Sequence, residues 1–212
     1  MPFYGSFKVV FKKYYYRCKN QYNVYKSRAK DKNSINCHFP RDRSVYMHFV
    51  KAKGILSNNN GINIYRGCTH GCIYCDSRSK CYGFTHDFED IEVKTNAPEL
   101  LEKSLRSKRK KCMIGTGAMC DPYLHAEEQL QITRRCLELI DKYEYGVAIQ
   151  TKSTRILRDL DVLKNINDKT KAIVQMTLTT YDESLCKILE PNVSSTYERF
   201  EALMQFKKAG IP

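Results

Sequence analysis

Four short apolar runs alternate with helix-like segments from residue 61 to the end of the sequence. Alternation at this spacing predicts a parallel sheet with right-handed crossovers and helices packed against it. The runs are apolar almost throughout, as expected when helices cover the strands. We therefore predict an α/β fold, a partial TIM-type (β/α) barrel of about four βα units. The predicted strands are residues 62–67, 112–117, 146–151 and 171–180.

Capping signals mark the predicted helices between these strands. Pro98 lies in a first turn, and Ser153 is a predicted N-cap. Ser195 and Glu198 have the spacing of a capping box, and Gly210 is a predicted stop. Four units do not close an eight-unit barrel, so we expect its C-terminal strands to be missing. The predicted helices are residues 97–111, 127–143, 153–166 and 194–210.

The basic charge is concentrated near the N-terminus. Residues 1–60 contain thirteen Lys/Arg, two Asp/Glu and seven of the fifteen tyrosines, whereas the rest contains twenty-three Lys/Arg and twenty-one Asp/Glu. A basic, aromatic segment can contact phosphates and stack on bases, which makes nucleic acid a candidate partner. Charge alone is weak support. We expect residues 1–50 to be a poorly ordered, Tyr/Lys-rich basic extension ahead of a core domain at 51–212.

The sequence also predicts the compartment. No apolar run approaches the roughly 18 residues that span a membrane, and the N-terminus has no signal-peptide pattern. Ten cysteines in such a chain favour thiol or metal chemistry over a disulfide framework. We therefore expect a cytoplasmic protein with no membrane partner.

Four cysteines cluster after the first predicted strand. Cys68, Cys72 and Cys75 have the spacing C-x3-C-x2-C, and Cys81 follows. Thiolates select zinc, copper(I) or iron–sulfur clusters. Three cysteines on a cubane cluster would leave one iron free to bind a small molecule. With Cys81 or His70 as a fourth ligand, the loop would instead be a closed structural metal site.

The cysteine motif and its neighbours resemble a known family. The segment "CTHGCIYC" resembles the cluster motif C-x3-C-x-(aromatic)-C of the radical S-adenosylmethionine (SAM) superfamily. With "GTGAMCDPY", "TKSTRILRDLD" and "LEPNVSSTYERFEAL", it resembles the subgroup related to spore photoproduct lyase over residues 50–212. The resemblance implies a [4Fe-4S] cluster on Cys68, Cys72 and Cys75, with SAM at the open iron.

The resemblance also implies a reaction. An electron donor such as a flavodoxin or ferredoxin would reduce the cluster, and SAM would be cleaved to methionine and a 5′-deoxyadenosyl radical. This radical would abstract hydrogen from a substrate that the sequence does not identify. In such enzymes the cofactors supply the chemistry, and the protein orients and shields them. We expect a radical SAM enzyme, or an inactive fragment of one.

Four residues at strand ends are candidate cofactor ligands by this resemblance. Tyr74 would pack beside the adenine and the cluster. Asp121 would accept hydrogen bonds from the ribose or amine, although an aspartate in "CDPY" also suits a turn. Lys152 would pair with the methionine carboxylate, since a buried lysine is costly unless paired. Thr177 would donate to the ribose or carboxylate, or simply be a strand threonine.

Other positions bear on the reaction. By the resemblance, Ala118 stands where spore photoproduct lyase has the cysteine that returns a hydrogen atom, which weighs against the same lesion reversal. Cys120 is a weak catalytic candidate as hydrogen donor, the competing interpretation being a serine-like replacement. Glu190 and Arg199 are expected to pair structurally, outside the site. A DNA photolesion lyase and a nucleic-acid-binding protein with a structural metal are the alternative functions.

Substitution of Cys81 separates the open cluster from the closed metal site. Cys81→Ala should leave about four irons per chain if three cysteines hold a cubane cluster, whereas Cys72→Ala should remove them. Metal analysis after anaerobic reconstitution measures both variants. Loss of all metal in Cys81→Ala, or stoichiometric zinc in the colourless wild-type protein, would support the structural site instead.

Overall fold

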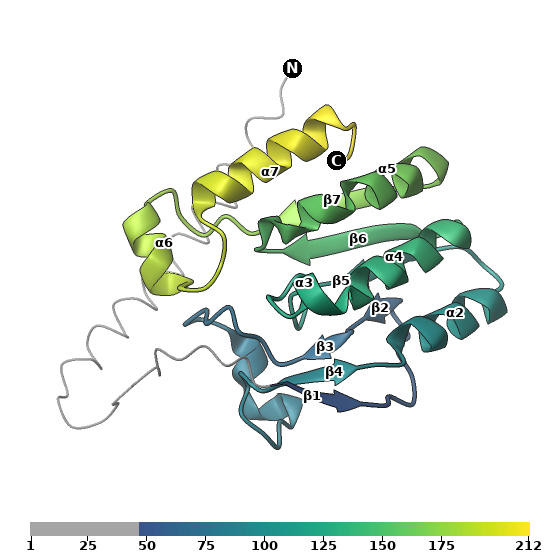
Figure 1. Cartoon of the computed structure of the whole chain (residues 1–212), viewed down its shortest axis with the longest axis horizontal. Helices are drawn as coiled ribbons and strands as arrows, with labels where there is room; N and C mark the ends of the chain where they lie inside the picture. Colours follow the sequence, from purple (N-terminus) through teal and green to yellow (C-terminus); the bar gives the residue numbers. More distant parts are fainter. Residues whose placement is uncertain (1–46) are drawn as a thin grey trace. The chain divides into compact units, whose positions relative to one another are not determined.

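The computed structural model describes residues 47–212 (Figure 1). Most of the predicted extension therefore lies outside the described residues, although β1 falls inside the range 1–50 assigned to it. The strands are β1 (Met47–Val50), β2 (Gly61–Ile62), β3 (Tyr65–Arg66), β4 (Ile91–Lys94), β5 (Met113–Thr116), β6 (Gly146–Thr151) and β7 (Ala172–Met176). The α-helices are α2 (Ala97–Ser107), α3 (Glu127–Leu130), α4 (Ile132–Lys142), α5 (Leu160–Lys169), α6 (Glu183–Leu189) and α7 (Thr196–Lys208). Short 3₁₀ helices span Asp76–Arg78, Lys80–Tyr82 and Thr154–Asp159.

A four-stranded parallel sheet in the order β2-β5-β6-β7 organises the fold. Its register pairs Ile114 with Val147 and Ile149 with Val174. Helices α2, α4 and α5 follow one another alongside this sheet, with α2 packed on α4 and α4 on α5 (Figure 1). The α/β class and the partial barrel of parallel strands are thus confirmed, and the described strands do not close on themselves.

A second, smaller sheet is not predicted by the sequence. β4 pairs in parallel with β1 and antiparallel with β3. The strand predicted over 62–67 therefore divides, with β2 joining the parallel sheet and β3 joining β4. In β4, Ile91 and Val93 are buried while Glu92 and Lys94 are half-buried. Four residues of this alternation give too short a pattern for prediction.

Two predicted helices form with breaks. The helix predicted over 127–143 is interrupted at Gln131, whose φ of 50° separates α3 from α4. The helix predicted over 153–166 begins as 3₁₀ turns and continues as α5. The Ser153 side chain accepts a hydrogen bond from the Arg155 N–H, which confirms the predicted cap.

The last helix confirms its capping signals. Ser195 accepts from the Glu198 N–H while the Glu198 side chain accepts from the Ser195 N–H, a complete capping box. Gly210 follows α7 with a φ of 75°. The short helix α6 is not predicted by the sequence. No helix within residues 47–212 is long and apolar enough to cross a membrane.

The hydrophobic core joins the parallel strands to the helices beside them. Full burial of each large aliphatic side chain contributes roughly 1.5–3 kcal/mol. The fully buried core residues include Ile114, Val147, Ile149, Leu163, Ile166, Leu101 and Ile140.

A buried polar network fixes the start of β3 against the helices. Glu127 is fully buried and accepts hydrogen bonds from the Tyr65 hydroxyl, from the Thr133 N–H at 3.1 Å and from Arg158 at 2.9 Å. Arg158 also pairs with the buried Asp159 at 2.9 Å. Since each buried charge has several partners, the network is satisfied and holds the strand that leads into the cysteines.

The loop after β5 requires glycine at position 117. Gly117 has a φ of +97°, and a Cβ there would lie 1.8 Å from the carbonyl oxygen of Gln150. Gly117→Ala should lower the free energy of unfolding by at least about 2 kcal/mol, because backbone strain and a clash combine. Gly115→Ala is the matched control, since a Cβ there meets nothing within 4 Å. It should change stability by less than about 1 kcal/mol in chemical denaturation, and equal losses in both variants would refute this assignment.

Candidate functional site

The cysteine loop, residues 67–75, connects β3 to the first 3₁₀ helix. Cys68 and Cys75 are half-buried and Cys72 is buried, and all three are free thiols. The Cys68 N–H donates to the carbonyl of Phe88 at 2.9 Å. The loop therefore presents three cysteine side chains from a backbone that is anchored where it leaves β3.

The number of cysteines on the loop indicates the kind of group that it can hold. A structural zinc site takes four protein ligands, whereas a cubane cluster held by three cysteines leaves one iron free for a small molecule. Three free thiols on one loop therefore suit a cubane cluster.

Burial keeps the thiols of Cys68 and Cys72 protonated. Burial raises the pKa of Cys68 to about 12 and that of Cys72 to about 11. The nearby charge of Lys152 acts in the opposite direction on the Cys72 thiol. Because metal ligands must be thiolates, iron or zinc has to displace these protons on binding.

Two polar atoms beside the cysteines have no hydrogen-bond partner among the described residues. They are the hydroxyl oxygen of Thr69 and Nε2 of His70, and both are buried. Buried polar groups are normally satisfied, so such atoms point to a group that binds beside them. Together with three free thiols, they form a donor set that fits a cluster and a polar ligand.

The cysteine loop packs on the segment that follows α6. The Ile73 N–H donates to the Leu189 carbonyl at 3.0 Å, and the Asn192 N–H donates to the His70 carbonyl at 3.2 Å. The Asn192 side chain also donates to the Thr69 carbonyl at 2.9 Å. Residues 189–192 therefore pack against the cysteine loop and support its backbone, a role that the sequence does not reveal.

Tyr74 is held by a buried ion pair. Its hydroxyl donates to Glu190 and lies 3.1 Å from the Thr179 hydroxyl. Glu190 pairs with Arg199 at 2.9 Å, both side chains being fully buried. The predicted pairing is confirmed, but Glu190 also contacts the predicted site through Tyr74. Burial and the Glu190 carboxylate both raise the pKa of Tyr74, which keeps the phenol protonated.

Asp121 joins three strand ends. One carboxylate oxygen accepts from the Thr151 hydroxyl at 2.7 Å and from the Tyr123 N–H at 2.8 Å. The other accepts from the Lys152 N–H at 2.8 Å and lies 3.5 Å from Nδ1 of His70. The bond to Tyr123 is the turn contact that the sequence allows, and both oxygens are already engaged by this chain.

Lys152 and Thr177 lie where β6 and β7 end. The Lys152 ammonium is 5.7 Å from the centroid of the Tyr74 ring, which places a positive charge beside the cysteine loop. The Thr177 N–H donates to the Thr151 carbonyl at 3.3 Å, and its own carbonyl accepts from Arg199. The structure thus brings Tyr74 and Lys152 together, while the contacts of Thr177 are made by its backbone.

Cys120 faces the cysteine loop. Its buried thiol donates to the Gly67 carbonyl at 2.7 Å, and burial raises its pKa well above the ordinary value. A serine hydroxyl could make the same bond, which favours the serine-like interpretation over a hydrogen donor. Ala118, two residues earlier, is exposed.

Comparison with known sequences gives a family and relatives. The profile of the radical SAM superfamily matches residues 62–212. An uncharacterized protein of Methanocaldococcus jannaschii is 32% identical over 152 residues, covering 71% of this chain and 56% of that protein. One from Mycobacterium tuberculosis is 26% identical over 163 residues, covering 71% and 46%. The chain spans about half the length of the curated relatives it matches.

Solved structures match the fold. Spore photoproduct lyase complexed with dinucleoside spore photoproduct has a TM-score of 0.58 at 18% identity, covering 78% of this chain and 48% of that chain. A point mutant of spore photoproduct lyase has a TM-score of 0.60 at 16% identity, covering 91% and 61%. At these identities the likeness shows a shared fold.

Neutralising Glu190 tests the ion pair behind Tyr74. Glu190→Gln should lower the free energy of unfolding by about 3–5 kcal/mol, because Arg199 would be left buried without a counter-charge. Glu201→Gln makes the same chemical change at an exposed position of α7 and should stay within about 0.5 kcal/mol of wild type. Urea unfolding measures both. Wild-type stability of Glu190→Gln would show that the pair contributes nothing net.

Proposed function

Because the chain belongs to the radical SAM superfamily, we propose that Cys68, Cys72 and Cys75 hold a [4Fe-4S] cluster and that the protein cleaves SAM reductively. The observation that carries this proposal is the set of three free thiols on one loop, beside two buried polar atoms that have no hydrogen-bond partner among the described residues. Cys81 is exposed on the Lys80–Tyr82 3₁₀ helix, which gives little support to a closed four-cysteine zinc site.

The reaction proposed for the site is a one-electron cleavage. Cys68, Cys72 and Cys75 would hold the cluster, which would supply the one electron needed to cleave the C–S bond of SAM to methionine and a 5′-deoxyadenosyl radical. A low-potential donor such as a flavodoxin or ferredoxin would supply the electron to the cluster, and hydrogen would be abstracted from a substrate not yet identified.

The chain's own residues orient this chemistry. Lys152 provides a cation beside the cysteine loop that suits the methionine carboxylate. Tyr74, held by Glu190, presents a ring of fixed orientation for the adenine. Asp121, with both oxygens engaged, positions the Lys152 backbone and His70. In this proposal Thr177 contributes a polar side chain at the end of β7, and Cys120 supports the loop.

The proposed substrate differs from that of spore photoproduct lyase. Spore photoproduct lyase, which shares the fold, has been solved with a dinucleoside spore photoproduct and with bound AdoMet. Ala118 weighs against the same lesion reversal here, so we propose a different hydrogen-abstraction substrate. A nucleic-acid partner would depend on residues 1–50, most of which lie outside the described part of the chain. A cytoplasmic location fits a cluster that needs a reducing compartment.

Product analysis and SAM binding test the proposal. The reconstituted, dithionite-reduced chain should form 5′-deoxyadenosine from SAM. Lys152→Met should retain the cluster but weaken SAM binding by about tenfold or more, since a charge-assisted bond of about 1.5–3 kcal/mol is lost. Lys164→Met, at an exposed lysine of α5, is the matched control. A reconstituted, iron-loaded chain that neither binds SAM nor forms 5′-deoxyadenosine would refute the proposal.

A further inference from the structure

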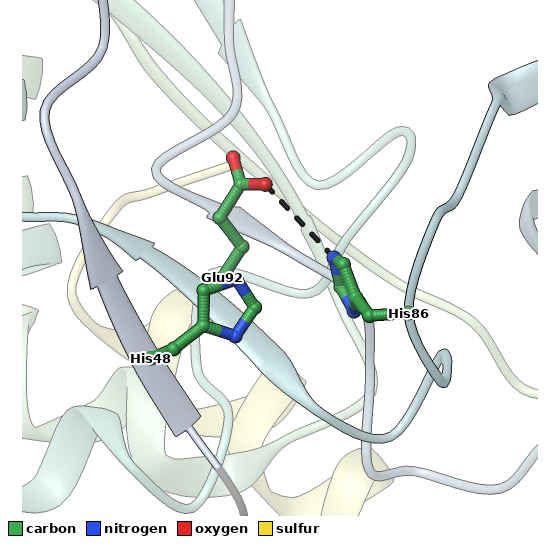
Figure 2. Close-up of side chains that lie close together, drawn as sticks. All are labelled: His48, His86 and Glu92. Carbon is green, nitrogen blue, oxygen red and sulfur yellow. Dashed lines mark ion pairs between the residues drawn. The ribbon is translucent and has the colours of Figure 1, made fainter.

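Three potential metal ligands converge outside the cysteine loop. His48 on β1 and Glu92 on β4 are register partners in neighbouring parallel strands. His86 comes from the segment before β4, and ligand atoms of the three residues lie within 4.8 Å of one another (Figure 2). Ile91 and Val93 are fully buried, so Glu92 projects from the face of β4 opposite the core.

Both imidazoles are oriented through the same ring nitrogen. Nδ1 of His48 is 3.0 Å from a carboxylate oxygen of Asp90, and Nδ1 of His86 is 2.9 Å from the carbonyl oxygen of Asp87. Each of these oxygens only accepts, so each Nδ1 must carry the hydrogen. In the neutral rings the lone pair is then on Nε2. Metal-binding histidines show this arrangement, in which an outer acceptor fixes the tautomer.

The free lone pair of His86 faces a carboxylate. Its Nε2 is 4.0 Å from Oε2 of Glu92, the contact that is marked by the dashed line in Figure 2. This nitrogen is buried with no hydrogen-bond partner in residues 47–212. A lone pair and a carboxylate oxygen repel each other unless a proton or a metal cation lies between them. The rings of Phe84 and His48 pack edge-on against His86, with centroids 5.6 Å and 4.8 Å away, and restrict its rotation.

The two cationic side chains near Glu92, Arg66 and Lys94, interact with other groups. Arg66 is the register partner of Glu92 on β3, but its guanidinium lies over the Phe84 ring at 4.7 Å and donates to the Gly83 carbonyl. Lys94 donates to the Asn63 carbonyl at 2.8 Å. Neither forms an ion pair with Glu92 within the described part of the chain, so the carboxylate stays available to a ligand.

We propose that His48, His86 and Glu92 bind a divalent transition-metal ion, with zinc as the reference. Two imidazoles and one carboxylate are an established donor set for zinc, and they leave a fourth position for water. Zinc would bring the ligand atoms to about 3.3 Å from each other, slightly closer than His86 and Glu92 now lie. The ion would link β1 to β4 and to the segment that precedes β4. Asp90 would act as a positioning residue for His48.

Cobalt titration tests this site, because Co²⁺ replaces zinc and reports its ligands in its absorption spectrum. The full-length chain with Cys68, Cys72 and Cys75 all changed to alanine should bind a single Co²⁺, with visible bands but no thiolate charge-transfer bands. Adding His86→Ala or Glu92→Gln should weaken Co²⁺ binding by at least about tenfold, and Asp90→Asn by about 10- to 100-fold.

Asp87→Asn is the matched control. Asp87 is exposed, and this substitution removes a charge from the same segment without removing a proposed ligand. It should bind Co²⁺ like the parent chain. If the chain with the three alanine substitutions does not fold by circular dichroism, His86→Ala or Glu92→Gln in the wild-type chain should remove one equivalent of bound Co²⁺ and leave the thiolate charge-transfer bands. Absence of Co²⁺ binding, or binding unaffected by His86→Ala and Glu92→Gln, overturns the proposal and leaves a protonated His86 paired with Glu92.

Discussion

The buried ion pair between Glu190 and Arg199 is the interaction on which the cysteine loop most depends. Both side chains are fully excluded from solvent, and the pair is completed by hydrogen bonds from Tyr74 to Glu190 and from Arg199 to the Thr177 carbonyl. A buried pair is stabilising only when such bonds satisfy its remaining donors and acceptors. The same four groups link α7, the end of β7 and the cysteine loop. Stability and site geometry therefore rest on one polar cluster.

A second set of hydrogen bonds, made by Asp121, connects the ends of the central strands. Both carboxylate oxygens of Asp121 accept hydrogen bonds, which come from Thr151, Tyr123 and Lys152. The carboxylate also lies close to His70. Its role is to hold the loops after β5 and β6 at a fixed separation from the cysteines, so that the Lys152 charge stands near the Tyr74 ring. A preorganised cation of this kind costs no rearrangement when an anion binds.

Local patterns predicted the features that local sequence determines. The four parallel strands, the Ser195 and Glu198 capping box and the C-x3-C-x2-C spacing all lie within short windows. The contacts that the sequence does not reveal join residues far apart in the chain. Tyr74 and Glu190 are 116 residues apart, and β1 meets β4 only through the pairing of two strands of four residues each. No periodicity encodes such pairings, because loop closure and tertiary packing select them.

The burial of two thiols in the cysteine loop affects how they react with oxidants. Burial holds Cys68 and Cys72 as neutral thiols, and neutral thiols are poor nucleophiles towards peroxide and disulfides. In the presence of an oxidant, neighbouring thiolates would otherwise be prone to form disulfides with one another. The burial that makes these two thiols release protons when they bind a metal therefore also slows their oxidation.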